Sequence, residues 1–572
     1  MTKKQKLELT WIGKGDSPVL EPRILIEDPT KEFGDSASDN MLIHGDNLLA
    51  LKALEQDYAG KIKCIYIDPP YNTGSAFEHY DDGLEHSEWL NLMQPRLVLL
   101  KELLCLNGIL AVQIDDNEFA RLYLLLAEIF GDKNLKVICV KMSEATGVKM
   151  ASVKKLGTIP KLKEYIILAG RNGVRNLKVE KIPKDKWDFE YKTVCTNISK
   201  EELEFIKNVL EDEARSNDDL AKVDDLAKKI KFENINTFAK SQTGTNATDD
   251  WLYENAYRIV QFATLTGGAR DIAVNKKATT PSDRSAFSIS TPQNRAYLIK
   301  TDFNHETRLP RCKFLFADIY LEVHPGDFWQ DIKTTGLDNE GSVNFSNGKK
   351  PEKLIKRIIS MTTDEGDIVL DSFLGSGTTA AVAHKMKRRW IGIELGEHAN
   401  THAVPRLQKV ISGADQGGVS KELSWNGGGG YKFYELAPSL LVKDTFGNWV
   451  ISEAYDADKL AHAMAKQEGF NYKPSQTVYW QQGGSTEKDY IYTTTQYVTI
   501  DLLDSIHNEL QDGQSLLIAC KAFDTECKDR FDNITIKKIP QILLGRCEFG
   551  QDDYSLNITE AVDEEAGEEN EE

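Results

Sequence analysis

The chain has 572 residues, of which 89 are acidic and 70 basic, so its formal net charge is −19. Apolar residues make up 41% of it, which excludes a largely disordered protein and provides enough chain for about three or four domains. No apolar run approaches 20 residues and none follows the N-terminus, so we expect no membrane span, no secretory signal and a cytoplasmic location. The eight cysteines form no CxxC pair, and we therefore predict no metal site.

Part of the negative charge is local. Residues 560–572 carry eight acidic and no basic residues, a pattern typical of a disordered, solvated tail. A basic groove can coexist with an acidic whole, so the net charge does not exclude a nucleic-acid partner.

Short apolar runs alternate with helical patterns over residues 41–172. Hydrophobic spacing predicts strands at 41–46, 61–68 and 108–114, and helices at 47–57, 88–106 and 118–130. Strands that alternate with helices favour an α/β fold with a parallel sheet.

The pattern changes at residue 173 and returns at 351–412. Ser199 and Glu202 form a capping-box signature, and the charged run from there to Phe232 predicts helix. Residues 268–311 hold eight basic and four acidic residues, which makes this stretch a candidate for DNA contact together with Trp251 and residues 253–257. A solvated loop explains any single basic residue equally well. The candidate DNA-binding residues are Arg270, Lys276, Lys277, Arg284 and Arg295.

The first motif that carries chemistry spans residues 368–394. An apolar strand ends at Asp371, a turn with Gly375 and Gly377 follows, a helix begins near Thr378, and a second strand ends at Glu394. Such a βαβ unit lets a nucleoside cofactor approach the turn and offers a carboxylate to ribose hydroxyls. The glycine spacing also fits a dinucleotide site, so NAD stays an alternative on this motif alone. No GxxxxGK[ST] sequence is present, which argues against an ATP-driven motor.

The second motif, Asp68-Pro69-Pro70-Tyr71, directly follows a buried strand. The prolines stiffen the turn and remove two N–H donors, so that carbonyls are free to accept hydrogen bonds. A fixed carboxylate, a free carbonyl and an aromatic ring together suit a planar group that bears an amine.

The two motifs together resemble the S-adenosylmethionine-dependent DNA amino-methyltransferases, which combine a Phe-x-Gly-x-Gly loop with an Asp-Pro-Pro-Tyr loop. The order found here, catalytic loop first, is that of the family's β class, a circular permutation. Residues 9–14, 113–118 and 537–558 also look like modification (Mod) subunits of type III restriction-modification systems. The resemblance implies a circularly permuted Rossmann-like methyltransferase sheet with an inserted target-recognition domain and a C-terminal α+β domain.

The resemblance also implies roles for individual residues. Asp68 and the Pro69 carbonyl would accept the amine of a flipped-out adenine, with Pro70 stiffening the loop and Tyr71 stacking on the base. Asp rather than Ser in this loop favours N6 of adenine, and N4 of cytosine stays an alternative. The residues expected to bind S-adenosylmethionine are Asp46, Asp371, Phe373, Gly375, Gly377, Thr378, Glu394, Lys350 and Pro351.

The implied partners are double-stranded DNA, a second copy of the chain and a separate restriction subunit with helicase and nuclease activity. An alternative reading is a specificity and assembly subunit whose main role is DNA recognition and partner binding. The domain boundaries that we expect are an N-terminal extension (1–40), a catalytic half (41–172), a target-recognition region (173–330), a cofactor half (331–412), a linker (413–430), a C-terminal domain (431–558) and an acidic tail (559–572).

Overall fold

The computed structural model describes residues 8–71, 82–143, 153, 157–184, 186–332, 337, 340–341 and 349–554. The chain forms two compact units, which we call unit 1 (Met1–Val179 and Gly326–Glu572) and unit 2 (Glu180–Pro325). Among the described residues, no helix combines the length and the apolar character that crossing a bilayer requires.

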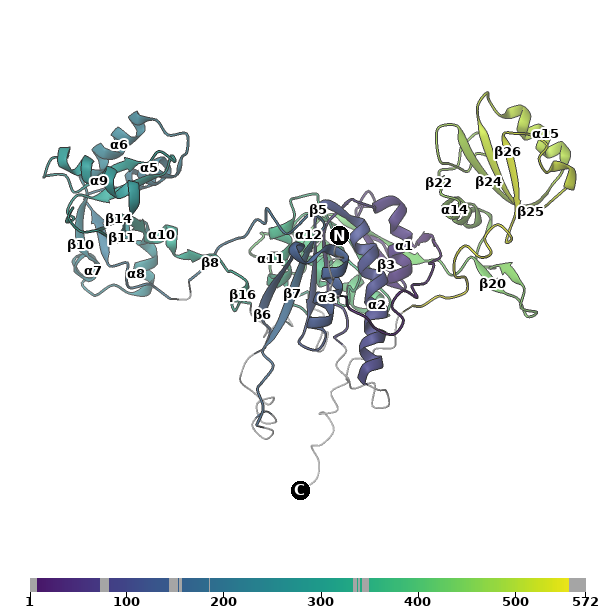
Figure 1. Ribbon diagram of the computed structural model, residues 1–572, viewed down its shortest axis with the longest axis horizontal. Helices are drawn as coiled ribbons and strands as arrows, with labels where there is room; N and C mark the ends of the chain where they lie inside the picture. The colour runs from purple at the N-terminus through teal and green to yellow at the C-terminus, as the bar shows by residue number, and fades with distance from the viewer. Residues whose placement is uncertain are drawn as a thin grey trace, which may run out of the picture. The chain divides into compact units, whose positions relative to one another are not determined.

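Unit 1 is built on a sheet that has eleven strands in the described residues (Figure 1). In spatial order these are β1 (Leu25–Glu27), β19 (Gly430–Leu436), β3 (Met41–His44), β18 (Arg389–Glu394), β17 (Ile368–Asp371), β4 (Ile62–Ile67), β5 (Leu104–Ile114), β7 (Lys163–Gly170), β6 (Leu135–Lys141) and β16 (Phe328–Trp329), with β2 (Phe33–Gly34) beside β19. The strands from β19 to β5 run parallel, whereas β7 is antiparallel to both of its neighbours. The predicted parallel sheet is therefore a mixed one.

Helices cover both faces of this sheet. One face carries α1 (Asn47–Tyr58), α2 (Asp82–Leu103) and α3 (Phe119–Phe130), and the other carries α11 (Glu352–Thr362), α12 (Thr378–Lys385) and α13 (Val404–Ile411) (Figure 1). Along β4, Ile65 and Ile67 pack under the first group, while Cys64 and Tyr66 pack under the second. Burial on both faces explains why the strands read as continuous apolar runs in the sequence.

The elements predicted for residues 41–68 and 118–130 are confirmed to within one or two residues at each end. The helix predicted at 88–106 instead starts at Asp82 and ends at Leu103, and β5 begins at Leu104. Leu104 pairs with Ile62, and the register shifts before Cys64 pairs with Ile109. Because of this bulge, β5 also includes residues 104–106, which the apolar spacing had assigned to the helix.

The predicted linker and the start of the C-terminal domain differ from the structure. Asp415 and Val419 are buried, so residues 413–430 pack into unit 1. Residues Gly430–Leu436 form β19, which pairs with β3 in the main sheet. The glycines that indicated a linker make tight backbone contacts: the N–H of Gly428 donates to the Ile411 carbonyl.

The C-terminal part of unit 1 contains a smaller five-stranded sheet and a two-stranded ribbon. The sheet consists of β22 (Asn471–Tyr472), β23 (Gly483–Gly484), β24 (Asp489–Val498), β25 (Ser515–Phe523) and β26 (Ile534–Lys538). The helices α14 (Ala457–Gln467) and α15 (Ile500–Glu509) accompany it, and the ribbon pairs β20 (Leu441–Lys443) with β21 (Trp449–Ile451). This is the α+β composition that the sequence indicates.

Unit 2 has a six-stranded sheet in the order β10, β9, β11, β14, β13, β12. The capping box of Ser199 and Glu202 is confirmed at the start of α5, but the helix predicted to reach Phe232 is interrupted, and Phe232 lies in β10. The elements are β8 (Ile182–Pro183), β9 (Thr193–Thr196), α5 (Lys200–Glu211), α6 (Asn217–Ala227), β10 (Lys231–Asn234), α7 (Ile235–Thr243), α8 (Asp249–Glu254), β11 (Ile259–Thr264), α9 (Gly267–Thr279), β12 (Ala286–Ser290), β13 (Ala296–Lys300), β14 (Arg311–Phe316), α10 (Ala317–Tyr320) and β15 (Glu322–Val323).

Candidate active site

Three neighbouring strands of the main sheet bring an acidic residue to the same edge. Asp371 ends β17, Glu394 ends β18, and Asp68 directly follows β4. The chain passes from β17 to β18 through α12 on one face and from β4 to β5 through α2 on the other. The connections therefore diverge between β17 and β4, which is where open α/β sheets form ligand-binding crevices.

The loop after β4 holds Asp68 and Tyr71 side by side. The Tyr71 hydroxyl donates to Asp68 Oδ1 at 2.7 Å, and the Asp68 side chain is 21% exposed. The Pro70 carbonyl accepts a hydrogen bond of 2.7 Å from the buried Trp89 indole, which anchors the loop to α2. In the described part of the chain the Pro69 carbonyl accepts no hydrogen bond, so it is available to a ligand.

Two residues from distant segments complete a polar cluster around this loop. Lys350 Nζ lies 3.2 Å from Asp68 Oδ2, 3.2 Å from Glu164 Oε2 and 2.8 Å from the Tyr71 hydroxyl. The Tyr71 hydroxyl is also 2.8 Å from Glu164 Oε2. Glu164 belongs to β7, and Gln113 of β5 donates to it. Lys350, which we predicted at the cofactor, therefore lies against the loop of Asp68.

The cluster shifts the ionisation of its members. Burial raises the pKa of Asp68 to about 6, although the Lys350 charge opposes the shift. Burial also acts to raise the pKa of Glu164, but Lys350 and the hydrogen bonds from Gln113 and Tyr71 outweigh it, so this pKa lies below its ordinary value. Both carboxyl groups are consequently ionised near neutral pH.

The turn after β17 has the open backbone that its glycines suggested. Gly375 and Gly377 have φ angles of 53° and 81°. A Cβ on Gly375 would meet nothing within 4 Å, whereas a Cβ on Gly377 would lie 3.3 Å from Ala403. Gly377 precedes the first residue of α12, Thr378. The turn thus exposes backbone on one side and packs closely against its own unit on the other.

The acidic residues on either side of this turn hold its backbone. Glu394 accepts hydrogen bonds from the N–H groups of Gly375 (2.7 Å) and Gly396 (3.0 Å). Asp371 accepts from the N–H of Phe373 at 2.9 Å. Burial raises the pKa of Asp371 to about 7, and the nearby charges of Asp68 and Glu394 add to the shift. Asp68, Asp371 and Glu394 therefore lie close enough for the charges of Asp68 and Glu394 to affect the pKa of Asp371.

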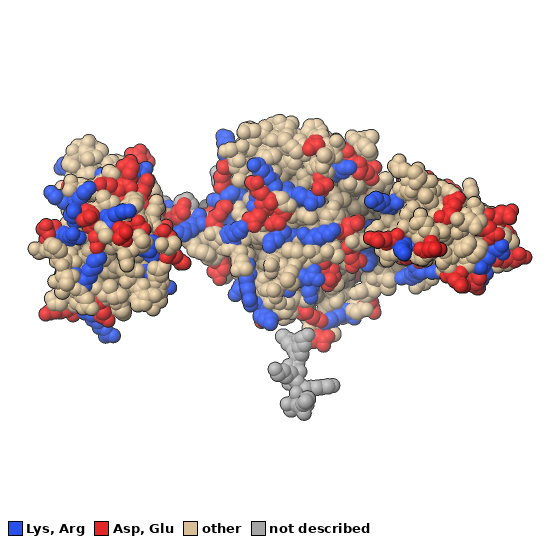
Figure 2. Space-filling model, turned by 90° about the horizontal axis from the view of Figure 1, so that it is seen from above, with Lys and Arg blue, Asp and Glu red and all other residues tan. Residues whose placement is uncertain are grey.

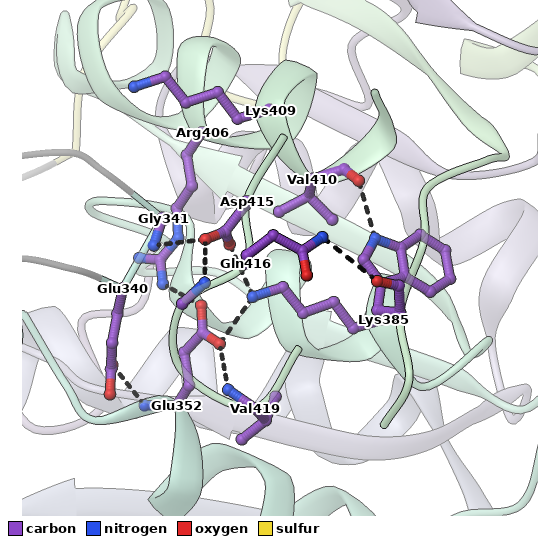
Figure 3. A network of polar contacts seen from close by, with 12 residues as sticks. Glu340, Gly341, Glu352, Lys385, Arg406, Lys409, Val410, Asp415, Gln416 and Val419 are labelled. Atoms are coloured by element: carbon purple, nitrogen blue, oxygen red, sulfur yellow. Dashed lines mark hydrogen bonds and ion pairs between the residues drawn. The ribbon is translucent and has the colours of Figure 1, made fainter. Parts of the chain in front are cut away.

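A buried network of charged side chains, shown in Figure 3, contacts the start of α12 through Arg406. Arg406 donates to the Thr378 hydroxyl at 2.6 Å and to Glu352 at 2.7 Å. Lys385 Nζ contacts Glu352 at 2.8 Å and Asp415 at 2.7 Å, and all four charged side chains are at most 1% exposed. Because Glu352 lies two residues after Lys350, this network connects the glycine turn with the segment that contacts Asp68.

Asp46, one of the residues predicted to bind the cofactor, uses both carboxylate oxygens within unit 1. It caps α1 by accepting from the N–H of Leu49 at 2.9 Å. Its other oxygen lies 3.4 Å from Arg96 and accepts from the N–H of Tyr554 at 3.1 Å. The next residue, Asn47, donates to the Ser372 carbonyl at 2.8 Å, so the start of α1 contacts the strand end that precedes the turn.

The remaining predicted cofactor residues lie close to these. Pro351 is buried and caps α11, and Phe373 is half-buried against the core under α1–α3. Glu164, Glu352 and Arg406 were not among the predicted site residues. Glu164 could have been noticed in the sequence, because an acidic residue at the start of an apolar strand is unusual. The pairing of Glu352 with Arg406 could not, because it depends on tertiary contacts.

Of the five basic residues predicted to contact DNA, three are used within unit 2. Lys276 pairs with Asp224 at 2.5 Å, Lys277 donates to the Phe303 carbonyl, and Arg270 donates to the His305 carbonyl at 3.0 Å. The side chains of Arg284 and Arg295 make no hydrogen bond or ion pair with the described residues. Basic and acidic side chains are interspersed on the face of unit 2 that Figure 2 shows.

Within the described ranges, no three His, Cys, Asp or Glu residues are grouped so that they could hold a metal ion.

The sequence is 36% identical over 428 residues to the probable type III restriction-modification enzyme HindVI Mod subunit of Haemophilus influenzae, an alignment that covers 70% of this chain and 54% of that protein. It is 26% identical over 513 residues to the EcoP15I Mod subunit of Escherichia coli, covering 77% and 73%. The chain thus spans about half the length of the HindVI protein.

Among solved structures, the M1.HpyAVI–SAM complex matches with 13% identity and a TM-score of 0.30, covering 64% of this chain and 98% of that one. The DNA methylase family profile, which describes N6 and N4 methyltransferases, matches residues 62–404. This match includes the loop of Asp68, the glycine turn and all of unit 2. Because it extends over more than half of the sequence, the chain belongs to the N6/N4 DNA methylase family.

Proposed function

We propose that this protein is a site-specific DNA methyltransferase that transfers a methyl group from S-adenosylmethionine to N6 of a flipped-out adenine. The observation that carries the proposal is the juxtaposition of Asp68 with the glycine turn at the carboxyl ends of the neighbouring parallel strands β4 and β17. A carboxylate that can accept an amine lies beside a backbone turn that can receive a nucleoside cofactor. Family membership supports this reading over the dinucleotide alternative.

Asp68 and the Pro69 carbonyl hold the target amine. An exocyclic amine is a weak nucleophile because its lone pair is delocalised into the ring. When two fixed acceptors take both N–H bonds, the nitrogen is held toward tetrahedral geometry and the positive charge that develops on it is stabilised. Trp89 fixes the loop through the Pro70 carbonyl, so this geometry is set before the base arrives. Tyr71 supplies a ring on which the extruded base stacks.

The glycine turn suits the cofactor. When bound, S-adenosylmethionine supplies a methyl group on an electrophilic sulfonium. The open face at Gly375 admits a ligand to the backbone, and Glu394 places a carboxylate next to it for ribose hydroxyls. We assign Asp371, Phe373, Gly377 and Thr378 to the same pocket. The engaged side chains of Asp46 and Lys350 support the pocket from its borders.

We further propose the circularly permuted arrangement of the β class, in which the half with Asp68 precedes the half with the glycine turn. Unit 2 is inserted between the halves and lies within the predicted recognition region, residues 173–330. The proposal assigns DNA recognition to this unit, with Arg284 and Arg295 as candidate contacts, since these two of the five predicted residues make no side-chain hydrogen bond or ion pair with the described residues.

We propose two protein partners for this chain. The HindVI and EcoP15I proteins are Mod subunits of type III restriction-modification enzymes. We propose that this chain likewise modifies DNA together with a restriction subunit, and that it acts as a homodimer because one recognition region per copy serves an asymmetric site poorly. Sedimentation of the protein with and without site-containing DNA tests the dimer.

The Asp68→Ala variant tests the proposed chemistry. We expect it to lose methyl transfer while its affinity for DNA and for S-adenosylmethionine stays near that of the wild type. Incorporation of labelled methyl groups measures the first property, and DNA binding and calorimetry measure the others. Full transfer by this variant would refute the assignment of Asp68. If the wild-type protein produced N4-methylcytosine, the mechanism would stand and the target base would be cytosine instead of adenine.

A further inference from the structure

The carboxylate proposed to accept the target amine is already occupied in this structure. Asp68 Oδ1 accepts from the Tyr71 hydroxyl at 2.7 Å, and Asp68 Oδ2 lies 3.2 Å from Lys350 Nζ. Lys350 Nζ also lies 4.8 Å from the centre of the Tyr71 ring, on the ring that the base would stack against. The target amine can donate to an unoccupied Asp68 carboxylate only if the Tyr71 hydroxyl and Lys350 Nζ have another acceptor.

Glu164 offers that partner to both donors. Its Oε2 lies 2.8 Å from the Tyr71 hydroxyl and 3.2 Å from Lys350 Nζ, nearly the same distances as in their contacts with Asp68. A hydroxyl has a single proton, so Tyr71 can donate to Asp68 or to Glu164 but not to both at once. The geometry therefore contains two alternative hydrogen-bonding arrangements within one cluster.

Glu164 is itself held in place. Gln113 donates to the same Oε2 atom, and the Tyr66 hydroxyl in turn donates to Gln113 Oε1 at 2.6 Å. Gln113 and Tyr66 are both buried, so their hydrogen bonds hold Glu164 in the position described. Glu164 can thus receive Tyr71 and Lys350 without moving.

Charge gives a second reason for Glu164. Asp68, Glu164 and Lys350 together carry a net charge of −1 when all are ionised. A nitrogen that receives a methyl cation becomes positive, and this net negative charge stabilises it. Without Glu164, Lys350 would neutralise Asp68, and the remaining pair of Asp68 and Lys350 would present no net charge to the nitrogen.

We propose that Glu164 is a positioning residue for the proposed methyl transfer: it takes over Lys350 and Tyr71 when the target amine binds, and so leaves Asp68 free as acceptor. This inference rests on the proposed function. Glu164 does not touch the reacting atoms, and it acts through Lys350 and Tyr71.

The Glu164→Gln variant removes the charge and keeps the size. We expect its kcat to fall by about 10- to 100-fold, the equivalent of one charge-assisted hydrogen bond, while its KM for S-adenosylmethionine changes little. Loss of the nearby negative charge should also lower the pKa of Asp68, so the acidic limb of kcat should move to lower pH. Glu468→Gln is the matched control, since Glu468 is 7% exposed and pairs with Arg546 in the C-terminal part of unit 1.

A second substitution separates this role from a structural one. If Glu164 acts by neutralising Lys350, then adding Lys350→Met to Glu164→Gln restores the net charge of −1 and should recover at least half of the lost kcat on a logarithmic scale. Lys350→Gln replaces Lys350→Met if the double variant does not fold, as judged by circular dichroism. Wild-type kcat in Glu164→Gln, or a double variant no faster than Glu164→Gln, would overturn the inference. A wild-type protein that makes no methylated base would refute the proposed function instead.

Discussion

Replacement of Lys385 by Met should strongly destabilise the part of unit 1 that supports the glycine turn. The Lys385 ammonium is fully buried between two carboxylates, 2.8 Å from Glu352 and 2.7 Å from Asp415. Coulomb's law with an effective dielectric constant of about 20 gives each contact about 6 kcal/mol, and desolvation of the buried groups offsets most of it. Breaking such a buried pair costs about 3–5 kcal/mol, because the carboxylates stay buried with one cation, Arg406, to balance them.

Native-state hydrogen exchange of the amides in α11 and α12 measures this loss locally, which avoids the assumption that the whole chain unfolds in one step. We expect the free energy of opening these helices to fall by about 3–5 kcal/mol in Lys385→Met. The double variant Lys385→Met/Asp415→Asn should lose less, since it restores charge balance. Lys178→Met, which breaks an exposed pair with Asp364, should leave α11 and α12 unchanged. A loss below about 1 kcal/mol in Lys385→Met would refute the reasoning.

Two further predictions concern the proposed site. Asp68 must be ionised to stabilise the positive charge that develops on the amine nitrogen, and its pKa is raised to about 6, so kcat should fall about tenfold per pH unit below pH 6; a rate that stays constant down to pH 5 would contradict this. Gly377→Ala should weaken S-adenosylmethionine binding measured by calorimetry, since Gly377 has a φ of 81° and a Cβ would press on Ala403 at 3.3 Å. Gly366→Ala is the control, because Gly366 has a similar φ of 82° but a Cβ there would meet nothing within 4 Å. Equal losses of S-adenosylmethionine affinity in the two variants would show that the contact with Ala403 is not the cause.

The core of the fold could be predicted from the sequence because local pattern and tertiary role agree there. The strand β4 is a continuous apolar run, and its end is marked by Asp68 and two prolines, so both its position and the stiff loop were predictable. The turn at Gly375 and Gly377 was predictable for the same reason: the backbone angles found there are ones that glycine adopts readily.

The interior charges were not predictable in this way. Glu352, Lys385 and Asp415 lie in segments that resemble solvated helix ends or a linker, and only their mutual contacts explain why they are buried. The glycine run at 427–430 indicated a domain boundary, yet the chain continues into β19 of the main sheet, because pairing with β3 outweighs the local preference for a loop. The same limit applies to Lys276 and Lys277, whose basic character suggested DNA contact but whose partners lie within unit 2.

The central claim is tested most directly by incubating the wild-type protein with labelled S-adenosylmethionine and unmethylated genomic DNA, followed by mass spectrometry of the nucleosides. The proposed function predicts N6-methyladenine as the labelled product. Absence of any methylated base, with DNA and S-adenosylmethionine both shown to bind, would contradict it.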